Sequence, residues 1–149
     1  MKTAAKMLKK YGQRYLGGKI GFTAVLHTWG QTMQAHLHVH FMVSGGALAL
    51  TEAGARWQPA KKKFLFPAKK LSRDFRQAFC VGLRKLDKKG VLDWDKTTTG
   101  MNIEAMLGQA MKQRWEVYIE PPPANESNNR PETLAEYLSR YIHSIAIGN

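Results

Sequence analysis

Apolar and polar positions recur with two different periods along the chain, and these periods predict both helices and strands. Helical spacing of apolar residues occurs in three stretches, residues 3–16, 69–86 and 102–112. Alternation with a period of two, which is typical of strands, occurs in residues 20–29, 36–43 and 115–120. Because these elements do not follow a regular βαβ order, the pattern favours an α+β fold, in which an antiparallel sheet has helices packed on one face.

Turn-forming residues predict how these elements are connected. The stretch from Gly30 to Ala35 separates two strands and predicts a hairpin, and residues 55–66 predict a second, short hairpin with basic residues at its tip. The Pro- and Asn-rich residues 121–131 predict a linker to a last helix that begins near Glu132. A chain of 149 residues is long enough for one domain with a core, so we expect a single domain over residues 1–149, with a basic N-terminal helix in residues 1–18.

The charge of the chain predicts a polyanionic partner. Lys and Arg number 23 against 11 Asp and Glu, which gives a net charge of +12. The basic residues are spread along the chain without a wide lipid-facing stripe, which favours nucleic acid over a membrane. No apolar run predicts a signal peptide or membrane span, and the single Cys80 suits a reducing compartment, so we expect a cytoplasmic location.

Several basic and aromatic side chains are candidates for contact with a nucleic acid strand. The basic candidates for phosphate contact are Lys61, Lys62, Lys63, Lys69, Lys70, Arg73, Arg76 and Arg140. The aromatic candidates for stacking with unpaired bases are Trp57, Phe64 and Phe66.

The strand predicted at residues 36–43 presents three histidines on one face. His36, His38 and His40 share that face because side chains alternate along a strand, and the apolar residues between them fall on the face expected to pack. Neutral imidazole is the commonest metal ligand. A single His-x-His is more often a solvated or hydrogen-bonded pair, but a third histidine in phase favours a metal site.

A third ligand is expected from the neighbouring strand. If Trp29 pairs with His36 across the turn, His27 lies directly opposite His38, and directly paired residues share a face with Cβ atoms about 5 Å apart. We therefore expect His27, His38 and His40 to bind a metal, with His36 as the alternative third ligand. Ligand type alone does not identify the ion.

Two tyrosines lie one turn apart in the predicted last helix. Leu134, Leu138, Ile142 and Ile145 form an apolar stripe that contains Tyr141 and has Tyr137 at its edge. Such tyrosines usually only pack, but near a metal they are candidate nucleophiles. A phenol with a pKa near 10 is ionised to only about a thousandth at pH 7, and a divalent cation that polarises a phosphate offsets a cost of this size.

The chain resembles the two-tyrosine rolling-circle transposases of the HUH endonuclease superfamily. Four blocks carry the resemblance in the family's order: LHTWGQTMQAHLHVHFMVSGGAL, FLFPAKKLSRDFR, WEVYIEPP and YLSRYIHSIAIGN. The chain departs from the family at Glu120, where Lys is more common, and by lacking a cysteine-rich zinc module before the core and an extension after it. We therefore expect the catalytic core only.

The resemblance implies a function and a site. It implies DNA transposition, in which the metal-dependent core nicks single-stranded DNA and transfers a strand through a 5′-phosphotyrosine. It also implies that His38 and His40 hold Mg²⁺ or Mn²⁺ on an antiparallel sheet, and that Tyr137 and Tyr141 are the alternating nucleophiles.

Two other functions compete with this interpretation. The run HLHVHFM also matches the motif of histidine-triad nucleotide hydrolases and transferases, although only 35 residues precede it here and the tyrosines and charge would go unexplained. A non-catalytic fragment that binds single-stranded DNA is the interpretation to adopt if the metal site is incomplete.

Overall fold

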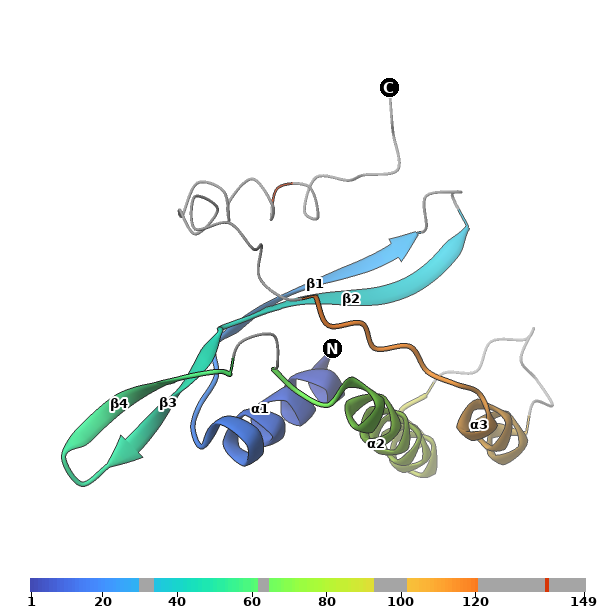
Figure 1. Cartoon of the computed structure of the whole chain (residues 1–149). Helices are drawn as coiled ribbons and strands as arrows, with labels where there is room; N and C mark the ends of the chain where they lie inside the picture. The colour runs from blue at the N-terminus through green and yellow to red at the C-terminus, as the bar shows by residue number, and fades with distance from the viewer. Residues whose placement is uncertain (30–33, 62–64, 93–101, 121–138, 140–149) are drawn as a thin grey trace. The chain divides into compact units, whose positions relative to one another are not determined.

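A computed structural model of the chain describes residues 1–29, 34–61, 65–92, 102–120 and 139. In chain order, its helices and strands are α1 (Lys2–Leu16), β1 (Phe22–Trp29), β2 (Ala35–Val43), β3 (Gly46–Thr51), β4 (Gly54–Pro59), α2 (Ala68–Lys88) and α3 (Ile103–Lys112) (Figure 1). The expected mixture of helices and antiparallel strands is confirmed. In the described ranges, however, the strands form two separate two-stranded sheets, β1-β2 and β3-β4, where we expected one sheet.

The chain divides into two compact units. The first contains Met1, Tyr11–Leu65 and Glu120–Asn149, and the second contains Lys2–Lys10 and Phe66–Ile119. Both hairpins therefore belong to the first unit, and α2 and α3 belong to the second.

The first hairpin has the predicted histidine register and an unpredicted irregularity near its turn. His27 pairs with His38, as expected, and Val25 pairs with His40. The register then shifts between His27 and Trp29, so that Trp29 pairs with Ala35. The expected pairing of Trp29 with His36 is therefore wrong, because a bulge uses one additional residue of β2 next to the turn.

The second hairpin lies earlier in the chain than the sequence pattern predicted. β3 pairs with β4 from Gly46↔Pro59 to Thr51↔Gly54, so the turn is formed by residues 52 and 53. Gly54 has φ 108°, a conformation that side-chain-bearing residues rarely adopt, and Thr51 Oγ1 donates a hydrogen bond of 2.8 Å to the Gly54 carbonyl. The expected hairpin over residues 55–66 is therefore wrong, since its first half is the second strand of this hairpin.

Two glycines that follow α1 bring the chain against the second hairpin. Gly17 ends α1 in the left-handed conformation, with φ 70° and ψ 16°. At Gly18 a Cβ atom would lie 2.5 Å from the backbone oxygen of Leu48, so only glycine allows the two backbones to approach this closely. Lys19 then exchanges backbone hydrogen bonds of 2.9 and 2.7 Å with Leu48. These contacts hold the segment that follows α1 against β3.

The second unit is held together by an aromatic cluster and by side chains of α2. The ring centroid of Trp115 lies 5.6 Å from that of Phe75 and 5.4 Å from that of Phe79. Ser72 and Arg76 donate hydrogen bonds to the carbonyls of Trp115 and Gln113.

The expected strand at residues 115–120 is wrong, because this segment is not assigned as a strand. Exposure does alternate along it as in a strand, with residues 115, 117 and 119 half-buried and the residues between them exposed. At and just before its start, side chains of α2 donate hydrogen bonds to the backbone carbonyls of Gln113 and Trp115. Period-two alternation therefore predicted an extended segment but not its pairing.

The C-terminal part of the chain falls mostly outside the described residues. This applies to the predicted linker at residues 121–131 and to the predicted last helix, of which Ser139 alone is described, as helical. Among the helices that the structure describes, none combines the length and the apolar character needed to cross a membrane.

Candidate metal centre

The β1-β2 hairpin brings three histidines together. His38 and His40 lie two residues apart on β2 and so share a face, and His27 lies directly across from His38 on β1. The ring centroid of His27 is 5.2 Å from that of His38 and 4.7 Å from that of His40, and the His38 and His40 centroids are 4.9 Å apart. The hairpin register therefore gathers residues from two strands into one cluster.

The opposite face of β2 is only partly covered. Val39, Phe41 and Val43 are half-buried, and the Phe41 ring packs edge-on against Phe22 at 5.6 Å. Leu37, however, is 76% exposed, so the expectation that the whole apolar face packs is wrong at this position. The packed part of the face lies toward the end of β2 that is remote from the turn, where Phe22 pairs with Val43.

The ligand atoms of the three histidines are close enough to meet at one ion. One nitrogen from each of His27, His38 and His40 lies within 4.8 Å of the other two, and all three side chains are half-buried. Small rotations of the rings can place these nitrogens at the roughly 2.0–2.1 Å that a metal–imidazole bond requires. No acidic side chain belongs to this cluster among the described residues.

The orientation of His38 is fixed by a backbone carbonyl. His38 Nδ1 lies 2.8 Å from the carbonyl oxygen of His36, and because a carbonyl can only accept, Nδ1 must carry the proton in this hydrogen bond. Nε2 then has its lone pair available for a ligand bond. Metal-binding histidines are commonly oriented in this way by a carbonyl acceptor on the other ring nitrogen.

His36 therefore participates through its backbone. Its ring is exposed and lies 4.9 Å from that of His38, but it is not part of the group of converging ligand atoms. The sequence analysis missed this hydrogen bond, because it depends on the rotamer of His38 and no sequence pattern indicates it.

The electrostatics of the cluster favour neutral imidazole at His40. The pKa of His40 is lowered from 6.5, first because burial disfavours the charged form, and then because of the charges that His27 and His38 would carry. A neutral ring is the form that binds a metal. The convergence of three nitrogens, the carbonyl that orients His38 and the lowered pKa of His40 together fit a divalent cation.

The structure distinguishes among the basic residues that we expected to contact DNA. Lys61, Lys69 and Arg73 are exposed. Lys70 forms a 2.9 Å ion pair with Asp74. Arg76 is used inside the second unit, where it donates to the Gln113 carbonyl. The remaining candidates, Lys62, Lys63 and Arg140, lie outside the described residues.

The aromatic candidates also differ. Trp57 is 52% exposed and can present its ring to a base, whereas Phe66 is only 4% exposed. The expectation that Phe66 offers a stacking face is therefore wrong. Phe64 and both candidate nucleophiles, Tyr137 and Tyr141, lie outside the described residues, so their roles stay predictions.

Comparison with known proteins identifies one family. The sequence model of a family described as "Putative transposase" matches residues 21–149, a range that includes the histidine cluster and both tyrosines. A "Putative transposase" of Sinorhizobium fredii is 37% identical over 140 residues, which cover 91% of this chain and 33% of the relative. The chain thus spans about a third of that relative's length. No solved structure matches the chain.

Proposed function

The chain belongs to the family described as "Putative transposase", and from this premise we propose that it is the core of a rolling-circle transposase that nicks single-stranded DNA and transfers the cut strand. The observation that carries the proposal is the convergence of His27, His38 and His40 within 4.8 Å. A family membership alone leaves the chemistry open. A cluster of three converging imidazoles supports a reaction that a divalent cation assists.

The covalent chemistry is assigned to the two tyrosines. The phenol oxygen of Tyr137 or Tyr141 attacks a phosphorus of the DNA strand and loses its proton to solvent. The bond from that phosphorus to the 3′ oxygen breaks, and the oxygen takes up a proton. The tyrosine then carries the 5′ phosphate. Because this ester conserves the energy of the broken bond, the strand can be passed to a new 3′ hydroxyl without an external energy source.

The histidines are assigned to the cation. Mg²⁺ or Mn²⁺ bound there would polarise the phosphate and stabilise the charge that develops during the attack. His38 presents Nε2 because Nδ1 donates to the His36 carbonyl, and His40 stays neutral because its pKa is lowered. Three imidazoles also suit other divalent metals, so the ion must be identified by experiment.

The family match favours this function over the two alternatives. The histidine-triad interpretation rests on the run HLHVHFM alone, whereas the transposase family matches residues 21–149 and so includes that run together with the tyrosines. A non-catalytic fragment that binds single-stranded DNA differs from our proposal only in lacking the covalent step. The experiment must therefore detect the covalent step itself.

The experiment is a search for a protein–DNA adduct. Single-stranded oligonucleotides labelled at the 5′ or the 3′ end are incubated with the protein and Mg²⁺, Mn²⁺ or a chelator, and the products are separated on a denaturing gel. We expect a metal-dependent adduct that retains only the 3′-side label, since the tyrosine keeps the 5′ phosphate. The substrates should include the ends of the element that encodes the protein.

The matched control is a set of tyrosine variants. Tyr137→Phe and Tyr141→Phe each remove one hydroxyl and little else, so the fold should be retained. We expect each single variant to impair strand transfer and the double variant to form no adduct. An adduct of undiminished yield from the double variant contradicts the mechanism.

A further inference from the structure

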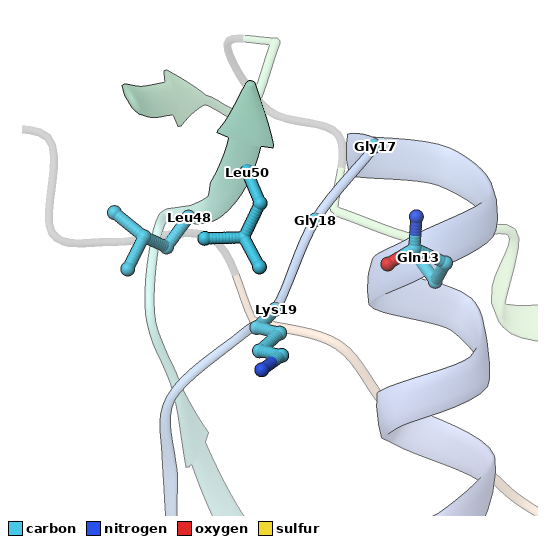
Figure 2. A pocket seen from close by; sticks show the side chains of 6 residues that line it. All are labelled: Gln13, Gly17, Gly18, Lys19, Leu48 and Leu50. Carbon is cyan, nitrogen blue, oxygen red and sulfur yellow. The ribbon is translucent and has the colours of Figure 1, made fainter. Parts of the chain in front are cut away.

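Gly17, the first residue after α1, lines two hollows of the first unit. The larger, of about 420 Å³, is lined by Tyr15, Leu16, Gly17, Gln58, Pro59 and Lys61. The smaller, of about 220 Å³, is lined by Gln13, Gly17, Gly18, Lys19, Leu48 and Leu50. Figure 2 shows the smaller one, with the Gly17–Gly18 segment running between α1, which contributes Gln13, and β3, which contributes Leu48 and Leu50.

The two hollows share Gly17 and are lined by the same kinds of side chain. Each is lined by one exposed lysine, one glutamine and apolar surface, and neither has an acidic lining residue. Lysine contacts phosphate, a glutamine amide can both donate to and accept from a base edge, and apolar surface accepts the face of a base. This combination occurs in both hollows, which share Gly17.

Backbone hydrogen bonds and side-chain contacts position several of the residues that line the hollows. Lys19 is held by its two backbone hydrogen bonds to Leu48, so its side chain leaves from a fixed point. Gln58 Oε1 lies 2.8 Å from the position that a Cβ of Gly17 would occupy, so its amide lies directly against the shared glycine. The ring of Tyr15 packs against Tyr11 with 5.2 Å between centroids, and the guanidinium of Arg14 lies 5.7 Å from the Tyr15 centroid. A further cation thus adjoins the larger hollow.

We propose that the two hollows form one binding site for two successive unpaired nucleotides of single-stranded DNA, with the strand passing from one hollow to the other at Gly17. Lys19 and Lys61 contact phosphates, the apolar surfaces accept base faces, and Gln13 and Gln58 contact base edges. The net charge of +12 supports a polyanionic occupant. The proposal rests on the proposed function, because that function names single-stranded DNA as the substrate, but it concerns binding away from the histidines and tyrosines.

The first test measures the affinity of the protein for fluorescent single-stranded oligonucleotides at several salt concentrations, without divalent metal. We expect the double variant Lys19→Ala/Lys61→Ala to bind about tenfold more weakly than the unaltered protein. The slope of log affinity against log salt should become shallower by about 1.4, because each lost phosphate contact on a single strand removes about 0.7 from it. Lys88→Ala, which removes an exposed lysine from the last turn of α2, should change the affinity by less than about twofold.

The second test asks whether bases enter the hollows. Gln58→Ala should change the relative affinities for oligo-dT, oligo-dA and oligo-dC while leaving the salt slope unchanged. Duplex DNA of equal length should depend less on Lys19 and Lys61 than single-stranded DNA does. If the double lysine variant matches Lys88→Ala, or if it weakens duplex and single-stranded binding equally, the site as proposed does not exist. Thermal melting of each variant establishes that it is folded.

These outcomes are separable from those of the adduct assay. A protein that binds through Lys19 and Lys61 but forms no adduct keeps this inference and overturns the proposed chemistry. A protein that forms the adduct, but whose lysine variants bind DNA normally, keeps the proposed chemistry and overturns this inference.

Discussion

His36 and His38 lie on the same face of β2 but have different roles in the cluster. The ring of His38 belongs to the converging group, and His36 contributes the carbonyl that orients it. A backbone carbonyl is retained when a side chain is removed. His36→Ala is therefore a matched control for His38→Ala, since each removes one imidazole from the same strand.

We expect His38→Ala to weaken divalent metal binding by at least about tenfold, since even the loss of an outer partner of a metal ligand typically costs that much. We expect His36→Ala to change it by less than about threefold, because the orienting carbonyl is retained. The first variant removes a converging nitrogen, whereas the second leaves all three nitrogens and the orienting carbonyl. Isothermal titration calorimetry with Mn²⁺, and with Zn²⁺ as a tighter probe, measures the difference. Equal losses in both variants would mean that the exposed ring of His36 is a ligand, as the sequence analysis had allowed.

The lowered pKa of His40 predicts how the metal-free protein responds to acid. In the folded chain the pKa of His40 lies below 6.5, mainly because of burial, whereas in the unfolded chain it lies near 6.5. As the pH falls through 6.5 the unfolded chain takes up this proton first. The contribution of His40 to the free energy of unfolding is therefore complete above pH 6.5 and is lost as the pH falls through the folded pKa.

NMR titration of the His40 ring protons measures this directly, with an expected midpoint below 6.5. His27→Ala should raise the midpoint, because it removes a neighbouring positive charge and part of the burial. A midpoint at or above 6.5 in the unaltered protein would show that the ring is solvated and not part of a packed cluster.

At the scale of elements, the absence of a side chain at Gly18 allows the segment after α1 to approach β3 closely. A Cβ at Gly18 would meet the backbone oxygen, carbon and nitrogen of Leu48–Ala49 at 2.5–2.7 Å, and backbone atoms cannot move aside as a flexible side chain can. We expect Gly18→Ala to destabilise the fold by about 1–3 kcal/mol, the usual cost of overpacking.

Gly21→Ala is the control for this prediction. A Cβ at Gly21 would meet no atom within 4 Å, and its φ does not lie in the positive region. Its unfolding free energy, measured by urea denaturation, should change by less than about 0.5 kcal/mol. If both variants lose the same amount, the loss comes from the glycine backbone itself and not from contact with β3.

Local patterns predicted elements well and their partners less well. Alternation and the position of the turn predict that His27 lies opposite His38, and this pairing is confirmed, although the pairing of Trp29 with His36 from which it was inferred is wrong. The bulge beside Trp29 could not be predicted, because it depends on how the turn closes. The second hairpin was misplaced because the basic run after Ala60 suggested a turn, whereas the turn precedes Gly54, whose positive φ only the structure reveals. Residues 115–120 have a strand pattern, but the Trp115 carbonyl accepts a hydrogen bond from the Ser72 side chain of α2, a tertiary contact that no local pattern contains.

At the scale of the whole molecule, the proposed cleavage of DNA and the proposed binding of DNA depend on different residues. The histidine cluster contributes three converging ring nitrogens, whereas the net charge of +12 comes from lysines and arginines spread along the chain. Long-range attraction of a DNA strand depends on the total charge and on salt, and it does not require a metal. The two activities should therefore respond differently to the same substitution.

The double variant His38→Ala/His40→Ala tests this separation. Since it removes two converging nitrogens but no cation of the basic surface, we expect single-stranded DNA affinity within about twofold of the unaltered protein and an unchanged salt slope. We expect no metal-dependent adduct on a denaturing gel. Fluorescence anisotropy and the gel assay are performed on the same preparation, and thermal melting establishes that the variant is folded. Undiminished cleavage would remove the metal-site assignment. Loss of DNA affinity in a folded variant would mean that these histidines contact the DNA strand directly, in addition to assisting its cleavage.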